Sequence, residues 1–311
     1  MPPEKNLKVI LSKLKYPDDA LVMKQITDQL IQVKTRMGLI KRKVVVMSGK
    51  GGVGKSLVTV NLALALARLG HKVGILDVDL NGPCVPKMLG LKGATMEITS
   101  EGAVPPTGPL GIKVASMEFF LKEGSPLRWK GPMDLSPVWL GMLEMSVLRE
   151  FLADILWGSL DYLLADLPPG AAADKPPVIV GFLPELDGAV IVTIPSEIST
   201  EVVRKSVLYA RDLGIPVLGL VENMSGYRCP DCNAISPLFE GDAKPLCDEL
   251  FLPLLGRIPF DRALGQSADQ GKPLLSESEP SVKIFTELAR QVQSRVDATI
   301  HFSIDAKETS P

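Results

Sequence analysis

The first residues that could carry chemistry are residues 49–56, which read G-K-G-G-V-G-K-S and contain the pattern G-x-x-x-x-G-K-S. Glycine accepts positive φ, so the backbone N–H groups of such a loop can turn inward around phosphate oxygens. In this pattern the last lysine reaches the β- and γ-phosphates of a nucleotide, and the hydroxyl that follows it ligates Mg²⁺. The segment predicts an ATP and Mg²⁺ site made by Gly49, Lys50, Gly51, Gly52, Val53, Gly54, Lys55, Ser56 and Leu57.

The residues on either side of this loop supply the context that the motif needs. Residues 44–47 are three valines and a methionine, which predicts a buried strand, and the Ala/Leu-rich residues 57–69 predict a helix. The N-terminus of that helix adds free amides and a favourable dipole to the phosphate site. A plain glycine-rich turn before a helix explains this combination much less well.

Aspartates end two further predicted strands. Residues 71–79 end in Asp77 and Asp79, and residues 161–166 end in Asp166. Open α/β sheets bind ligands at the carboxyl ends of their strands, so we expect these acids beside the phosphates. Alternate residues of a strand share a face, which would point Asp77 and Asp79 the same way. Asp166 fits a position from which it holds Mg²⁺ through a bound water.

The chain has four cysteines, and two of them, Cys229 and Cys232, form C-x-x-C in a Gly/Pro/Asp/Asn-rich loop at residues 225–237. Two thiolates seldom complete a four-coordinate metal site, and a symmetric dimer would supply the other two. A bridging [4Fe–4S] cluster fits such a Cys₄ set. Zinc in the same cage is the main alternative, and a thiol–disulfide pair is less favoured. Cys84 and Cys247 are predicted to be buried small apolar side chains.

The loop sequence resembles a known class. A second lysine directly after the first glycine, Lys50, is typical of the deviant P-loop ATPases, which include the Min and Par ATPases, the nitrogenase iron protein and the Mrp-type iron–sulfur carriers. Four more segments resemble the Mrp-type proteins, in the same order, within residues 40–273. They are D-V-D-L-N-G-P-C-V-P-K-M-L-G from Asp77, W-K-G-P-M from Trp129, D-Y-L-L-A-D-L-P-P-G from Asp161, and E-N-M-S from Glu222 followed by C-P-D-C.

The resemblance implies roles for particular residues. It implies a homodimer in which Lys50 reaches the partner's nucleotide, and an Asp79 that orients the water attacking ATP. It implies that Asn223 binds the adenine base, and we expect the segment beginning at Pro259 to close over that base. A solvated lysine, an aspartate that caps a turn and a strand-end asparagine are the simpler alternatives for these three positions.

One departure from the family pattern affects the expected activity. The family continues P-P-G-T-G-D, whereas this chain has Pro169-Gly170-Ala171-Ala172-Ala173-Asp174, without the threonine and with one residue more. We therefore expect slow ATP hydrolysis.

Composition and periodicity indicate the frame around these residues. The 311 residues are 46% hydrophobic and 23% charged, with a formal net charge of -2, which gives no basic field for nucleic acid. No apolar run is long enough to span a membrane, and the amino end has no apolar signal core, so a cytoplasmic protein is expected. We predict a doubly wound, mostly parallel α/β sheet of the P-loop NTPase type over residues 43–300, a helical extension over 1–42 and a frayed tail over 301–311.

Helical periodicity makes two further predictions that the structure can test. A helix over residues 19–36 should pack on the main domain through Val22, Ile26, Leu30 and Val33. A final helix over residues 281–297 should pack on the sheet through Val282, Phe285, Leu288, Val292 and Val296.

The best function from sequence is a homodimeric ATPase that carries an iron–sulfur cluster to apo iron–sulfur proteins. A Min/Par-like positioning switch is a different class, which would need a basic face or amphipathic terminal helix and has no use for C-x-x-C. A nucleotide-binding scaffold with little turnover is the third, favoured by the altered segment after Pro169.

Overall fold

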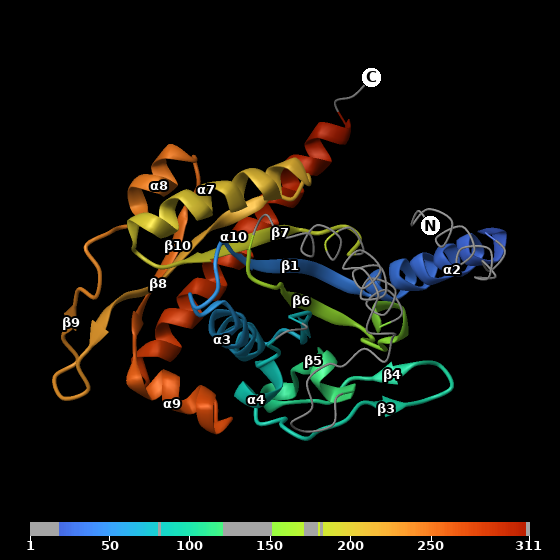
Figure 1. The fold of residues 1–311 in the computed structure, drawn as a ribbon, viewed down its shortest axis with the longest axis horizontal. Helices are drawn as coiled ribbons and strands as arrows, with labels where there is room; N and C mark the ends of the chain where they lie inside the picture. The colour runs from blue at the N-terminus through green and yellow to red at the C-terminus, as the bar shows by residue number, and fades with distance from the viewer. Residues whose placement is uncertain (1–18, 80–81, 121–150, 171–179, 181–182, 309–311) are drawn as a thin grey trace, which may run out of the picture.

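The computed structural model describes residues 19–79, 82–120, 151–170, 180 and 183–308, and its centre is a single parallel sheet (Figure 1). The strand order is β10-β8-β7-β1-β6-β2-β5, every neighbouring pair on this path is parallel, and β9 pairs antiparallel with β8. The strands are β1 (Ile40–Ser48), β2 (Val73–Asp77), β5 (Lys113–Ser116), β6 (Leu160–Asp166), β7 (Gly188–Thr193), β8 (Val217–Arg228), β9 (Ile235–Ser236) and β10 (Leu254–Phe260). This confirms the predicted α/β P-loop fold.

Helices cover the sheet on both sides, which makes the fold doubly wound. Helix α7 packs on β7 and β1, while α3 and α10 pack on each other and on β2, β6 and β10; Figure 1 shows α7 above and α3 below the central strands. The helices are α2 (Asp19–Met37), α3 (Lys55–Arg68), α4 (Val85–Met88), α7 (Glu197–Asp212), α8 (Lys244–Glu249), α9 (Arg262–Gln270) and α10 (Pro280–Glu308), with 3₁₀ turns η1 (Pro109–Gly111) and η2 (Met117–Phe120) and a hairpin of β3 (Glu97–Ile98) and β4 (Ala103–Val104).

The central strands form where the sequence is most apolar. Val44, Val45 and Val46 of β1 have no exposed surface, and neither do Val190 and Ile191 of β7. A parallel strand covered by helices on both faces needs apolar side chains on both, because neither face meets water. This is why a continuous run of valines, without polar alternation, predicted β1 correctly.

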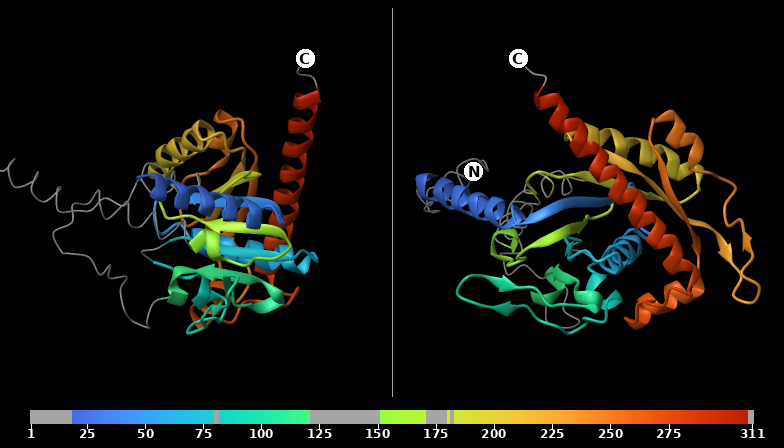
Figure 2. Two further views of the ribbon diagram at one scale, coloured as in Figure 1. Left: turned by 90° about the vertical axis from the view of Figure 1, so that its right-hand side faces the viewer. Right: turned by 180° about the vertical axis from the view of Figure 1, so that it is seen from behind.

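Helix α10 confirms one prediction and corrects another. All five residues of its predicted apolar stripe are buried. The helix does not end near residue 297, however, but continues to Glu308, so the predicted tail is helical through that residue. Figure 2 shows this C-terminal part projecting beyond the sheet. None of the helices in the described ranges combines the length and the apolar character that a bilayer crossing requires.

Helix α2 meets its prediction at Val33 but not at Leu30. Val33 and Met37 are buried, whereas Leu30 is 41% exposed, so the predicted stripe does not pack along its whole length. The Arg36 guanidinium ties the end of the helix to the β3–β4 hairpin by donating to the Glu101 carbonyl oxygen at 2.6 Å. Residues 1–18 of the predicted extension lie outside the described residues.

Candidate functional site

The glycine-rich loop connects β1 to α3 at the carboxyl edge of the sheet, as predicted. It borders a cavity of about 240 Å³ that is lined by loop residues 50–57 and by side chains that follow β2 and β6. Gly49 does not line the cavity. A Cβ at this position would lie 2.6 Å from Val202 Cγ1, so Gly49 allows α7 to approach the loop closely.

Gly54 shows why the loop needs glycine at the start of α3. It occupies the N-cap position with φ of 81°, in the left-handed region that other residues rarely adopt. A Cβ at Gly54 would also lie 2.3 Å from the amide nitrogen of Asn223. Both constraints fix the backbone from which Lys55 and Ser56 extend.

Asp166 is the polar centre of the site. Its carboxylate is fully buried and accepts from the Lys55 ammonium at 2.6 Å, the Ser56 hydroxyl at 2.5 Å and the Thr59 hydroxyl at 2.8 Å. The structure therefore brings three predicted site residues together. Thr59 was not predicted; the signal for it was a buried polar residue one turn into a mostly apolar helix.

The two acids that follow β2 do not share one role. Asp79 lines the cavity, and its carboxylate accepts from the Gly82 N–H at 3.3 Å. Asp77 is buried in register with Asp166 and does not line the cavity, contrary to the prediction that both would face it. Burial, and then the Asp166 carboxylate, raise the pKa of Asp77 to about 8.

Asn223 and Pro259, the predicted adenine contacts, lie outside the phosphate cavity. The Asn223 amide is 2% exposed and donates to the Val53 carbonyl oxygen at 2.7 Å, so it supports the loop from beneath. Asn223 also lies inside β8 and not at its end, because the strand continues to Arg228. Pro259 lines a separate cavity of about 730 Å³ together with Glu222, Ser225 and Arg257.

Cys84 corrects a prediction. It was expected to be a buried apolar side chain, but it is half-buried and lines the phosphate cavity at the N-cap of α4. Burial raises the pKa of this thiol, while a hydrogen bond with the Ser56 hydroxyl opposes the rise. Cys247 is buried as predicted, and burial raises the pKa of its thiol to about 11.

This placement predicts that an adduct on Cys84 blocks the nucleotide site. Alkylation by N-ethylmaleimide should abolish nucleotide binding, bound Mg²⁺–ADP should protect Cys84, and the Cys84→Ser variant should resist inactivation. Because only the thiolate reacts and burial raises the pKa of this thiol above its ordinary range, labelling should accelerate steadily as the pH is raised. Site-resolved mass spectrometry with nucleotide titration measures this. Full nucleotide affinity in quantitatively labelled protein would contradict the assigned position.

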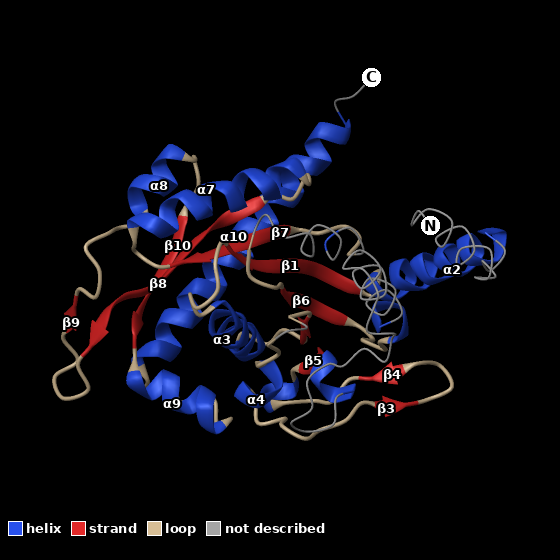
Figure 3. Ribbon diagram, viewed as in Figure 1, coloured by secondary structure: helices blue, strands red, loops and turns tan. Residues whose placement is uncertain are grey.

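The cysteine pair lies in the turn between β8 and β9, outside the sheet (Figure 3). The Cys229 N–H donates to the Ala234 carbonyl, and Cys229 accepts from the Asn233 N–H, each at 2.9 Å. The backbone N–H groups of Cys232 and Asp231 also hydrogen-bond the Cys229 sulfur and lower its pKa. Cys232 is exposed. The turn thus favours a thiolate and leaves it accessible.

The pair would need further ligands to hold a metal. Within the described ranges, no three His, Cys, Asp or Glu side chains are gathered closely enough for a metal ion. Two thiolates are half of the usual tetrahedral set, so the part of the chain that the structure describes does not complete a metal site around the pair.

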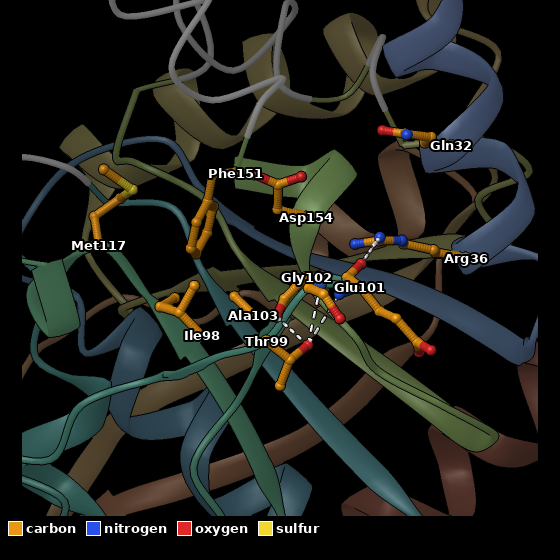
Figure 4. A pocket seen from close by; sticks show the side chains of 11 residues that line it. Gln32, Arg36, Ile98, Thr99, Glu101, Gly102, Ala103, Met117, Phe151 and Asp154 are labelled. Atoms are coloured by element: carbon orange, nitrogen blue, oxygen red, sulfur yellow. Dashed lines mark hydrogen bonds between the residues drawn. The ribbon is translucent and has the colours of Figure 1, made fainter.

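A third cavity lies away from all of these residues. Its volume is about 570 Å³, and it is bounded by α2, the β3–β4 hairpin and Phe151 (Figure 4). Arg36 extends toward it from α2, and Asp154 also lines it. None of the predicted site residues lines it, so it is separate from the nucleotide and cysteine sites.

The chain is similar to proteins of known name over most of its length. An iron-sulfur cluster carrier protein of Saccharolobus solfataricus is 43% identical over 272 residues, which cover 86% of this chain and 88% of that protein. A nucleotide-binding protein of Archaeoglobus fulgidus, solved in complex with ADP, is 38% identical with a TM-score of 0.69, covering 83% of this chain and 96% of that chain.

More distant structures share the fold alone. The MinD cell division protein of Aquifex aeolicus is 22% identical with a TM-score of 0.56, over 81% of this chain and 97% of that chain. The family described as ParA: NUBPL iron-transfer P-loop NTPase matches residues 39–293. Together with the loop at the end of β1 and the identity to named carriers, this match shows that the chain belongs to the iron-transfer P-loop NTPases.

Proposed function

We propose that this protein is a homodimeric, ATP-hydrolysing carrier that binds an iron–sulfur cluster between the cysteine pairs of two copies and passes it to apo iron–sulfur proteins in the cytoplasm. The observation that supports it most is an accessible C-x-x-C turn on β8, the strand that also contacts the phosphate loop. The names of the most similar relatives agree with it.

The nucleotide half of the proposal uses the residues around the 240 Å³ cavity. Loop amides and Lys55 would hold the phosphates. Oxygen donors suit Mg²⁺, and the site provides them: the Ser56 hydroxyl as a direct ligand, with Asp79 and Asp166 holding bound waters. Lys50 also lines the cavity, and in a dimer it would serve the partner's nucleotide.

Hydrolysis requires a water aligned with the γ-phosphate, and charge on the transition state is offset by Lys55 and the loop amides. Asp79 is the carboxylate that lines the cavity, and from there it would accept that water's hydrogen bond; Asp166 does not line the cavity and accepts from Lys55, Ser56 and Thr59. Slow turnover remains a prediction, because residues 171–179 lie outside the described residues.

Asp79→Asn should preserve nucleotide binding and lower the turnover number by about 10²–10⁴-fold, since it removes the base that orients the water. Phosphate release at saturating ATP measures the rate, and a titration with Mg²⁺–ADP measures affinity. Asp269→Asn, an exposed charge loss on α9, is the matched control. If Asp79→Asn hydrolyses ATP at the wild-type rate, Asp79 has a structural role and not a catalytic one.

The cluster half of the proposal is tested by transfer. Reconstituted protein should restore activity to an apo enzyme that requires a [4Fe–4S] cluster, and a chelator in solution should not intercept the cluster. A protein that acquires only zinc, or releases iron before the acceptor gains activity, would contradict a carrier. A Min/Par-like switch explains neither the cysteine turn nor its accessible thiols.

A further inference from the structure

One strand contacts both sites. The amide of Asn223 in β8 donates to the Val53 carbonyl of the phosphate loop at 2.7 Å, in a contact with almost no exposed surface. The strand ends at Arg228, and Cys229 follows directly. Any displacement of the loop at Val53 therefore acts on a strand whose far end carries the cysteine turn.

The pairing of β8 with β10 is irregular between Asn223 and Arg228. Asn223 pairs with Ile258 of β10, but the next pair is Tyr227 with Phe260, so β8 advances four residues where β10 advances two. Met224 lies in this irregularity with φ of 55°. Positive φ is uncommon for a residue with a side chain, and a β-bulge bends and twists its strand locally. Residues 224–226 are therefore the place where β8 departs from the regular ladder before it reaches the cysteine turn.

After this irregularity, two side-chain contacts connect β8 to Phe260 of β10 and to Asp261, the N-cap residue of α9. The Tyr227 and Phe260 rings lie 6.4 Å apart between centroids. Arg228 Nε lies 3.8 Å from Asp261 Oδ2, with both side chains nearly buried at 13% and 12% exposure. Asp261 is itself fixed, because it accepts from the Ala263 N–H and the Ser281 hydroxyl.

The contact between Arg228 and Asp261 is incomplete. Arg228 Nε is buried and has no hydrogen-bond partner among the described residues, and 3.8 Å is too long for a hydrogen bond. A small movement of Arg228 toward Asp261 would form a charge-assisted hydrogen bond. The pair can therefore distinguish a position of the turn with this bond from one without it.

We propose that β8 couples the two sites: nucleotide bound at the phosphate loop moves Asn223, the strand rotates at Met224, and the Arg228–Asp261 contact sets the position of the cysteine turn. This rests on the proposed function, since it requires that the loop binds nucleotide and that the cysteines are the cargo site. Asn223 and Arg228 are positioning residues here, acting through Val53 and Cys229.

The test measures thiol reactivity in the full chain before cluster reconstitution. Iodoacetamide labelling rates of Cys229 and Cys232 are followed by mass spectrometry, with and without saturating Mg²⁺–ADP or a non-hydrolysable ATP analogue. For each cysteine, the labelling rate with nucleotide and the rate without it should differ by about fivefold or more, in line with ordinary coupling between sites. This factor is the nucleotide-dependent ratio of labelling rates. Because each variant is compared with itself, a changed intrinsic thiol pKa cancels from the ratio.

Arg228→Gln should bring this ratio close to one with nucleotide affinity retained, and Asn223→Ala should do so at saturating nucleotide. Lys205→Gln, an exposed charge loss on α7, should keep the wild-type ratio. A wild-type ratio of one despite calorimetrically measured nucleotide binding would overturn the coupling alone. Unchanged ratios in both variants would also overturn it. Failure to bind nucleotide at all would overturn the proposed function together with it.

Discussion

Lys55→Ala should abolish productive binding of Mg²⁺–ATP. The ammonium is 6% exposed and is the buried cation of the phosphate cavity within the described part of the chain. Removing one partner of a buried, hydrogen-bonded charge pair costs about 2–5 kcal/mol, which corresponds to an affinity loss of roughly 30-fold to several thousand-fold. Isothermal titration with Mg²⁺–ATP measures it. Wild-type affinity in this variant would remove Lys55 from the nucleotide site.

The same substitution leaves Asp166 buried without its cation, so lost binding has to be separated from lost stability. The unpaired carboxylate would destabilise the fold by about 3–5 kcal/mol unless it takes up a proton. The double variant Lys55→Ala, Asp166→Asn removes that charge and should recover thermal stability while nucleotide binding stays lost. Recovery of binding along with stability would show that Lys55 acts on the fold alone. Lys244→Ala on the exposed surface of α8 is the control.

Cys229→Ser or Cys232→Ser should each reduce bound iron to background while leaving nucleotide affinity within about twofold. Thiolates are the ligands that iron–sulfur clusters use, and a serine hydroxyl is not ionised at neutral pH. The turn is outside the sheet, so neither change disturbs the core. Iron, sulfide and visible absorption should be measured together, because zinc would occupy the same thiolates without colour.

Two other cysteines provide matched controls for this experiment. Cys84→Ser, beside the phosphates, and Cys247→Ser, in the core, should both keep the cluster. Iron retained after loss of both Cys229 and Cys232 would disprove the assigned cargo site.

The sequence predicted the parts of this molecule that depend on local pattern. A run of buried valines located β1, and the G-x-x-x-x-G-K-S spacing located a loop that the structure places at the edge of the sheet beside Asp166. The apolar stripe of α10 was also correct. In each case one segment of chain carries the whole signal.

The errors arise where contacts between distant segments decide the outcome. β8 was predicted to end at Asn223 because the polar residues after it look like a loop, but pairing with β10 and β9 extends it to Arg228. Cys84 looked apolar, although the turn after β2 places it next to Ser56. The amide nitrogen of Asn223 donates to Val53, 170 residues away in sequence, a contact that no local pattern indicates.

The most direct test of the account is the stoichiometry of anaerobic reconstitution with iron and sulfide. If each copy supplies Cys229 and Cys232 to one shared cargo, the loaded species should be a dimer in light scattering, with about four iron and four sulfide ions for every two chains and the absorption of a [4Fe–4S] cluster. A monomer that carries a full cluster, or a loaded dimer that contains zinc and no sulfide, would contradict it.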